Sequence, residues 1–209
     1  MDSDQLCIPL VKYQKGWIVL PRKRGTGRYG NVRDACRKEK CTYVMKIIPF
    51  NERYSEKDFN KELAIQQKLY RFGMALKVTD YWTCNNKGVI IMKALDITLK
   101  DFLTKKLTEK DIDTISRYVK GLLKKLHTIG YYHGDNHFDN IMLQKVKSDD
   151  SHIHTSQGSY KLYFIDFGKS GKLTEQNAKK RIRIDNLIFD TEMKQASMPY
   201  KSEFETMMI

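Results

Sequence analysis

The polar segment 133–140, which contains acidic residues, limits the possible folds of this chain more than any other feature. The reason is its position in the sequence. It directly follows a predicted amphipathic helix over residues 108–130, in which apolar residues recur at spacings of three and four. A second acidic motif, Asp166-Phe167-Gly168, directly follows the apolar run 162–165. The pattern therefore predicts two carboxylates, each placed where a regular element ends.

The spacing within these motifs indicates phosphate chemistry. Asp135 and Asn140 are five residues apart, which suits one carboxylate that orients a hydroxyl and one amide oxygen that binds Mg²⁺. Asp166 adds a carboxylate that can bridge a metal ion to the β- and γ-phosphates of ATP. Phosphoryl transfer depends mostly on positioning and charge neutralisation, so few other groups are needed. The sequence predicts ATP and Mg²⁺ as cofactors.

A glycine-rich motif precedes both acidic motifs in the sequence. It reads Gly25-Thr26-Gly27-Arg28-Tyr29-Gly30-Asn31-Val32. A dinucleotide-binding motif requires a helix directly after the glycines, whereas here a polar stretch and a β-like segment follow. The alternative is a glycine-rich hairpin whose backbone amides cover nucleotide phosphates, with Val32 beneath the adenine. Taken alone, the motif is equally compatible with an ordinary hairpin.

A lysine in the next predicted strand, residues 42–48, strengthens the nucleotide interpretation. Lys46 is flanked by apolar residues, and a buried ammonium needs a partner. Glu62 stands sixteen residues later on a predicted helix that begins near Ser55, and an ion pair would hold Lys46 within reach of α- and β-phosphate oxygens. The alternative is that Lys46 extends to solvent.

These motifs, in this order, make residues 16–190 resemble the protein kinase superfamily. The resemblance implies an α+β, two-lobed protein-kinase-like fold with a truncated C-terminal lobe. Residues 1–94 would form the nucleotide-binding lobe and residues 95–209 the reduced helical lobe, together one kinase domain. It also implies a gatekeeper at Met92 and a hinge at Lys93 to Leu95 that binds adenine. In a later helix, Asp185 would brace the catalytic loop through backbone amides.

The resemblance assigns a role to each candidate residue. The catalytic set comprises Asp135 as the base, Lys46, its partner Glu62, and His137. The metal ligands are Asn140 and Asp166. The nucleotide-binding set comprises Gly25, Thr26, Gly27, Arg28, Tyr29, Gly30, Val32, Lys46, Met92, Lys93 and Leu95.

Two departures narrow the resemblance to compact atypical Ser/Thr kinases. Gly134 stands where most protein kinases have an Arg that meets an activation-loop phosphate, which implies activity without such phosphorylation. Only about twenty residues separate Asp166 from Asp185, and no A-P-E motif lies between them. Bud32-like kinases, vaccinia-related kinases and other kinases of large DNA viruses share this compactness, and they imply Ser/Thr hydroxyls of proteins as acceptors.

His137 supports a different class of acceptor. Ordinary Ser/Thr kinases have a Lys at this position, which neutralises the transferring phosphoryl group. His-Gly-Asp-x-His instead resembles the aminoglycoside and choline phosphotransferases, which act on small hydroxyl compounds. A non-catalytic kinase-like binding module is the third possibility, although none of the five motif residues is missing.

Charge and composition limit the partners and the compartment. With 38 Lys and Arg against 25 Asp and Glu, the net charge is +13, so acidic protein or nucleic-acid surfaces are possible partners beside the protein substrate. No apolar run is long enough to span a membrane, and no signal peptide opens the chain. We therefore expect an intracellular protein, cytoplasmic or nuclear, or one made in a virus-infected host cell. The sequence does not indicate the oligomeric state.

Two smaller expectations concern cysteines and histidines. The four cysteines, Cys7, Cys36, Cys41 and Cys84, form no C-x-x-C pair, and an intracellular compartment favours reduced thiols. The polar stretch 145–159 is expected to be an exposed loop, with His152 and His154 in solvent. The last forty residues are predicted to be helical over 178–189 and frayed beyond.

Overall fold

The computed structural model describes residues 16–27, 30–147 and 152–197. The chain divides into two compact units, residues 1–95 and 96–209. Among the described residues, no helix is both long and apolar enough to cross a membrane.

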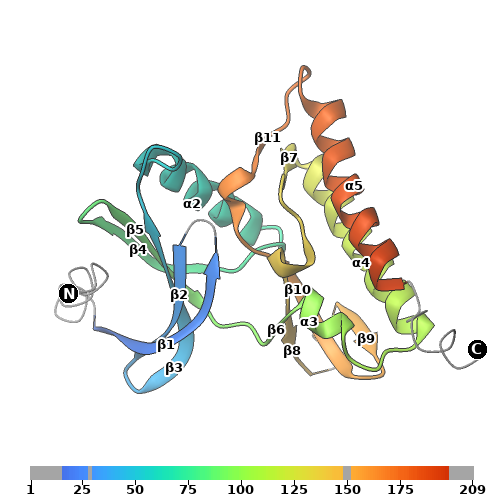
Figure 1. Ribbon diagram of the computed structural model, residues 1–209, viewed down its shortest axis with the longest axis horizontal. Helices are drawn as coiled ribbons and strands as arrows, with labels where there is room; N and C mark the ends of the chain where they lie inside the picture. The colour runs from blue at the N-terminus through green and yellow to red at the C-terminus, as the bar shows by residue number, and fades with distance from the viewer. Residues whose placement is uncertain (1–15, 28–29, 148–151, 198–209) are drawn as a thin grey trace, which may run out of the picture. The chain divides into compact units, whose positions relative to one another are not determined.

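The first unit is an antiparallel sheet accompanied by a helix (Figure 1). Its strand order is β1-β2-β3-β5-β4. The strand predicted over residues 42–48 lies within the sheet, and the β-like segment after the glycine motif is a full strand. The elements are β1 (Trp17–Gly27), β2 (Gly30–Arg37), β3 (Lys40–Pro49), α2 (Glu56–Tyr70), β4 (Val78–Cys84) and β5 (Lys87–Lys93).

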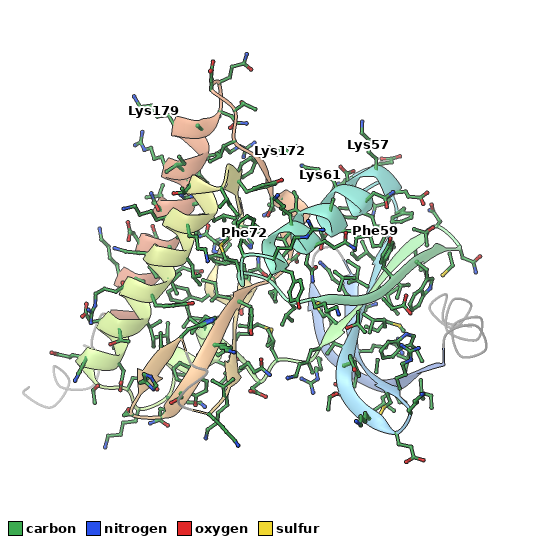
Figure 2. The ribbon with its side chains drawn as sticks, turned by 180° about the vertical axis from the view of Figure 1, so that it is seen from behind. Lys57, Phe59, Lys61, Phe72, Lys172 and Lys179 are labelled. Atoms are coloured by element: carbon green, nitrogen blue, oxygen red, sulfur yellow. A yellow bond between two sulfur atoms is a disulfide. The ribbon has the colours of Figure 1, made fainter. Side chains whose placement is uncertain are left out.

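Helix α2 begins where the sequence predicts. Ser55 and Asp58 form a capping box, which satisfies two backbone N–H groups at the helix start. Phe59 is fully buried and packs so closely on Gly88 of β5 that a Cβ atom there would lie 2.4 Å from its ring. Lys57 and Lys61 lie on the opposite, exposed side of the helix (Figure 2). This packing fixes which side of α2 faces the sheet.

The cysteines depart from expectation. Cys36 and Cys41 form a disulfide, with their Cα atoms 3.9 Å apart, and none of the described cysteines is free. The prediction of reduced thiols is wrong for this pair. The physical reason is the tight turn at Lys38 and Glu39, both at positive φ, which brings the end of β2 against the start of β3.

The second unit combines two long helices with two small antiparallel sheets, ordered β6-β8-β10-β9 and β11-β7. Helices α4 and α5 contact each other along their lengths (Figure 1). The elements are β6 (Ile97–Thr98), α3 (Leu99–Leu103), α4 (Glu109–Thr128), β7 (Tyr131–Tyr132), the 3-10 helix η2 (Phe138–Asn140), β8 (Ile141–Lys145), β9 (Ile153–Thr155), β10 (Gly158–Phe164), the 3-10 helix η4 (Phe167–Lys169), β11 (Gly171–Lys172) and α5 (Ala178–Ser197).

Helix α4 is capped by Thr108 and Asp111, which form a capping box. Asp111 also accepts hydrogen bonds from the backbone N–H and the hydroxyl of Ser156, at 2.9 and 2.6 Å. The core-facing side of α4 buries a stripe of aliphatic residues, among them Ile115, Val119 and Leu126. The predicted periodicity is therefore confirmed, and the same cap ties the helix to the segment before β10.

The stretch 145–159 is not simply an exposed loop. It contains β9, which pairs with β10 and buries Ile153. His152 is half-buried and stacks on Tyr118 with ring centroids 5.2 Å apart, so the expectation that it lies in solvent is wrong, whereas His154 is exposed as expected. Burial lowers the pKa of His152.

Candidate active site

In the first unit, a buried lysine and glutamate form the predicted ion pair. Lys46 Nζ on β3 lies 2.8 Å from Glu62 Oε1 on α2, and the two side chains are 10% and 1% exposed. Tyr54 donates a hydrogen bond to the other oxygen, Glu62 Oε2. The alternative that Lys46 extends to solvent is excluded, because its ammonium is held inside by Glu62. Tyr54 was not anticipated, since nothing in its local sequence distinguishes it.

The glycine motif forms a hairpin between β1 and β2. Gly25 pairs with Val32, Thr26 with Asn31, and Gly27 with Gly30; the predicted binding residues Arg28 and Tyr29 lie outside the described residues. A Cβ atom on Gly30 would lie 2.1 Å from the Ile47 carbonyl oxygen of β3. A strand, not a helix, follows the glycines, which excludes the dinucleotide-binding form of the motif.

The predicted gatekeeper and hinge lie at the end of β5. Met92 is buried, and its sulfur accepts from Gln66 Nε2 at 3.8 Å, whereas Lys93 is exposed. The carbonyl of Leu95 accepts a hydrogen bond from Arg24 Nη1 at 3.2 Å. Arg24 also pairs with Asp34, so this arginine fixes one backbone acceptor of the segment assigned to adenine binding.

In the second unit, Asp185 braces the segment that carries Asp135. Its carboxylate accepts from the backbone N–H of His133 at 2.9 Å and of Gly134 at 2.8 Å. Its backbone carbonyl accepts from Asn136 Nδ2 at 2.9 Å. The bracing role that the resemblance implied is therefore confirmed by direct contacts to three residues of the 133–136 segment.

Asp185 is fully buried, and its ionisation depends on these contacts. Burial acts to raise the pKa of Asp185, but the hydrogen bond from His127 Nε2, at 2.8 Å, and those from the two backbone N–H groups outweigh it. The net effect is a lowered pKa. The segment that carries Asp135 is thus built around a charged carboxylate.

His133 is a structural residue. It is fully buried, its Nδ1 accepts from the Asp135 N–H at 3.3 Å, and its Nε2 lies 3.1 Å from the Ile165 carbonyl. Since Nδ1 accepts, Nε2 carries the proton and donates. Burial lowers the pKa of His133, so the neutral ring ties the segment before Asp135 to the residue before Asp166.

The predicted metal ligands lie close together where β8 begins and β10 ends, because these two strands pair antiparallel. The N–H of Ile165, which precedes Asp166, donates to the Asn140 carbonyl at 3.0 Å. Asn140 Nδ2 donates to the Asp135 carbonyl at 2.8 Å, which leaves the amide oxygen as the atom of that side chain suited to a metal. Asp166 has a left-handed backbone, with φ 59°, a conformation that aspartate tolerates better than most residues.

This donor set fits a magnesium ion. Within the described ranges, no group of three or more His, Cys, Asp or Glu residues is arranged to hold a metal. Mg²⁺ is commonly held by one or two protein carboxylates together with substrate phosphates and water. An amide oxygen on Asn140 and a carboxylate on Asp166 match that chemistry when a nucleotide supplies the other ligands.

His137 is tied to a residue that the sequence analysis did not identify. Its Nδ1 lies 2.9 Å from Glu192 Oε1, and its Nε2 lies 3.6 Å from Asp135 Oδ1. The second oxygen of Glu192 accepts from the Phe138 N–H. Glu192 lies on the last turns of α5, beyond Phe189, where fraying was expected. The helix continues because Met193, one turn beyond Phe189, is buried like Phe189.

Comparison with known proteins decides the family. The model of the protein kinase domain matches residues 19–190, which is most of the chain and spans both units. This chain belongs to the protein kinase domain family. The fold prediction is confirmed as a kinase-like mixture of α and β elements, and the described part of the second unit has one α-helix, α5, after Asp166.

A solved kinase structure shows the same fold. The crystal structure of the PF14_0431 kinase domain matches with a TM-score of 0.58 at 20% sequence identity. The match covers 76% of this chain and 52% of that one. This chain therefore spans about half the length of the kinase domain to which it is similar.

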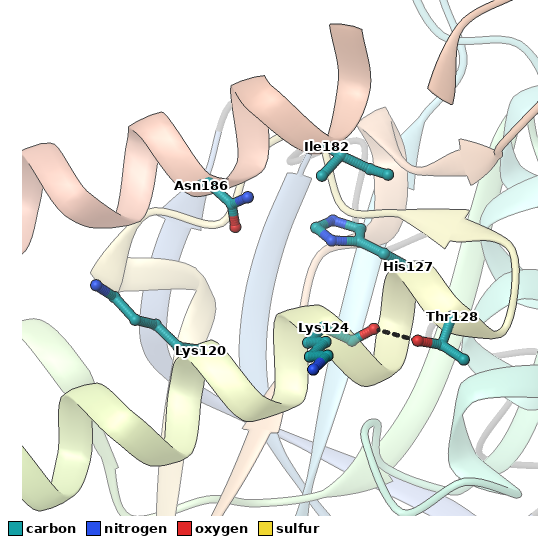
Figure 3. Close-up of a pocket in the computed structure, with 6 residues that line it drawn as sticks. All are labelled: Lys120, Lys124, His127, Thr128, Ile182 and Asn186. Atoms are coloured by element: carbon teal, nitrogen blue, oxygen red, sulfur yellow. Dashed lines mark hydrogen bonds between the residues drawn. The ribbon is translucent and has the colours of Figure 1, made fainter. Parts of the chain in front are cut away.

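The kinase domain also has a groove that contains none of the predicted site residues. It lies between α4 and α5, has a volume of about 480 Å³, and is lined by Lys120, Lys124, His127, Thr128, Ile182 and Asn186 (Figure 3). Its link to the candidate site is indirect, because His127 contacts Asp185, which in turn holds the Asp135 segment.

Proposed function

We propose that this kinase domain transfers the γ-phosphoryl group of ATP to Ser or Thr hydroxyls of protein substrates, with Mg²⁺ as the metal. The observation that carries the proposal is the junction of Asp135, Asn140 and Asp166 where β8 begins and its antiparallel partner β10 ends, braced by Asp185. Phosphoryl transfer requires a base, metal ligands and little else from the protein at the reacting atoms.

Each residue has a defined task in the proposed reaction. Asp135 accepts the proton of the substrate hydroxyl. Asn140 and Asp166 hold the metal ion, which neutralises charge on the phosphates. Lys46, fixed by Glu62, binds α- and β-phosphate oxygens, and the backbone N–H groups of the 25–30 hairpin cover the phosphates. The two units would thus serve as one kinase domain.

We also propose that the enzyme needs no activation-loop phosphorylation. Gly134 has φ +77°, and a Cβ atom there would lie 2.7 Å from the Lys169 carbonyl. An Arg at this position, which would meet a loop phosphate, is therefore disfavoured by the backbone and by space. This feature and the short interval between Asp166 and Asp185 support a compact kinase similar to the Bud32-like, vaccinia-related and other viral kinases.

A small-molecule acceptor is the second candidate, and His137 favours it. The net charge of +13 argues against cationic acceptors such as aminoglycosides, whereas it favours acidic protein surfaces. The experiment below distinguishes the two classes by where the phosphate is found.

The test uses γ-labelled ATP, Mg²⁺ and a whole-cell extract with wild type, Asp135→Asn and Asp139→Asn. Asp139 is a matched control, because it lies in the same segment but pairs with Lys100 at the surface. We expect label on protein with wild type and Asp139→Asn, and at least a hundredfold less with Asp135→Asn, which should still bind ADP. Label confined to small molecules would favour the second candidate, and equal labelling by Asp135→Asn would exclude Asp135 as the base.

A further inference from the structure

A lysine just after the second acidic motif contacts the proposed base directly. Lys169 Nζ lies 2.7 Å from Asp135 Oδ1. The side chains are 37% and 18% exposed, so the pair is accessible to a substrate and is not sealed in the core. The two residues are 34 positions apart in sequence, and Lys169 belongs to none of the motifs that predicted the site.

The backbone around Lys169 is held against the catalytic segment from both sides. Gly134 approaches the Lys169 carbonyl so closely that no side chain fits between them. On the other side, the hydroxyl of Ser170, which is 1% exposed, donates to the His133 carbonyl at 2.8 Å. Gly171 then pairs with Tyr132 in the β11–β7 sheet. The fold therefore fixes the backbone of Lys169 beside the 133–135 segment, and the ion pair with Asp135 holds its ammonium there.

His137 does not occupy this position. Its Nε2 is 3.6 Å from the same Asp135 oxygen, longer than a hydrogen bond, and its Nδ1 is engaged by Glu192. Of the two basic groups beside Asp135, only Lys169 makes a hydrogen bond to it. An ammonium that lies beside the base also lies beside the hydroxyl and the phosphoryl group that react there.

We infer that Lys169 is a catalytic residue whose ammonium contacts the transferring phosphoryl group, in place of the lysine that ordinary Ser/Thr kinases have at position 137. The inference rests on the proposed function. In the step, the bond between the γ-phosphorus and the β–γ bridging oxygen breaks, and its electron pair stays on ADP. The substrate hydroxyl oxygen forms the new bond to phosphorus and its proton passes to Asp135. Lys169 keeps its protons and stabilises the negative charge on the phosphoryl oxygens.

The first test compares Lys169→Met with Lys172→Met. Lys172 is an exposed lysine three residues later, on β11 (Figure 2). Removing one preorganised charge-stabilising donor lowers kcat by roughly a hundredfold to a thousandfold in other enzymes, and we expect a loss of that order for Lys169→Met. The KM for ATP and the melting temperature should change little, and Lys172→Met should match wild type. A Lys169→Met variant with wild-type kcat would overturn the inference, as would a loss of activity fully accounted for by unfolding.

The second test restores the charge from another position. His137→Lys, introduced into Lys169→Met, places an ammonium two residues after the base. We expect kcat to recover at least tenfold over Lys169→Met alone. A double variant no more active than Lys169→Met would show that the loss does not reflect a missing charge.

Failure of the proposed function is recognised separately, in the wild-type protein. If wild type transfers phosphate to protein, to a small molecule or to water, the role of Lys169 is measured on that reaction. If wild type transfers phosphate to none of the three, the proposed function fails and the inference about Lys169 fails with it.

Discussion

The Lys169 carbonyl lies so close to Gly134 that a Cβ atom added to the glycine would sit 2.7 Å from it. This contact joins the segment before the proposed base to the segment after Asp166. It explains why a glycine stands at a position where most kinases have an arginine, and it gives the first prediction.

Gly134→Ala should lower both the free energy of unfolding and the rate of phosphoryl transfer. The substitution strains a left-handed backbone and pushes Lys169 away from Asp135, so we expect a stability loss of about 2–4 kcal/mol and a fall in kcat of at least tenfold. Gly130→Ala is the matched control, because Gly130 also has positive φ, +84°, but has nothing within 4 Å of an added Cβ. Chemical denaturation and initial rates provide the measurements. Equal effects of the two substitutions would show that the contact with Lys169 has no importance.

Tyr54→Phe should weaken the site in the first unit. It removes a hydrogen bond to the buried carboxylate of Glu62, and hydrogen bonds to charged groups contribute about 1.5–3 kcal/mol. We expect a destabilisation of that order and a several-fold higher KM for ATP, since Glu62 then positions Lys46 less firmly. Tyr70→Phe, at the exposed end of α2, should leave both quantities unchanged. An unaltered KM and melting temperature in Tyr54→Phe would contradict this role.

Asp185→Asn should disrupt the catalytic segment. The amide cannot accept from His127, His133 and Gly134 together without turning its own NH₂ toward one donor. We expect a loss of about 3 kcal/mol in the free energy of unfolding, because a buried charged network is broken, and transfer reduced at least a hundredfold. Asp190→Asn is the control, because Asp190 is on the same helix as Asp185 but pairs with Lys120 of α4 at the surface. Full phosphoryl-transfer activity in the Asp185→Asn variant would contradict the bracing role of Asp185.

The cap of α4 should make stability depend on pH in a defined window. Burial acts to raise the pKa of Asp111, but hydrogen bonds from Ser156 and Thr108 outweigh it and lower the pKa from 3.8 to about 2. Because the folded-state pKa is the lower one, the stabilisation is fully present above pH 4 and is lost as the pH falls from about 4 to 2.

We expect this group to contribute about 1–2 kcal/mol at neutral pH, and Asp111→Asn should remove that part of the acid dependence. Asp113→Asn, whose partner Arg117 is on the surface, should not. The measurement is the free energy of unfolding by urea between pH 2 and 7. If the free energy of unfolding depended on pH in the same way in wild type and Asp111→Asn, Asp111 would not be the group responsible for this acid dependence.

Local signals in the sequence were sufficient for the elements that carry the motifs. Ser55 and Thr108 mark helix starts, and the apolar spacing in α4 marks its buried side. The ion pair between Lys46 and Glu62 was predictable because a buried ammonium needs a partner. The glycine motif was identified as a hairpin because a strand-like segment follows it.

Contacts between distant segments were not predictable in this way. Glu192 meets His137 across 55 positions, and Lys169 meets Asp135 across 34, and neither pair leaves a local pattern. The Cys36–Cys41 disulfide was not predicted because an intracellular compartment favours reduced thiols, whereas a tight turn brings the two cysteines together. β9 was missed because polar residues surround its single buried side chain, Ile153.

The central claim is that this kinase domain forms phosphoesters on protein hydroxyls. The most direct measurement is mass spectrometry of acceptor proteins from the reaction with ATP and Mg²⁺, with Asp135→Asn in parallel. The account predicts phosphoserine and phosphothreonine that appear with wild type and not with the variant. Consumption of ATP with no phosphorylated residue on any protein, or phosphate found on tyrosine alone, would contradict it.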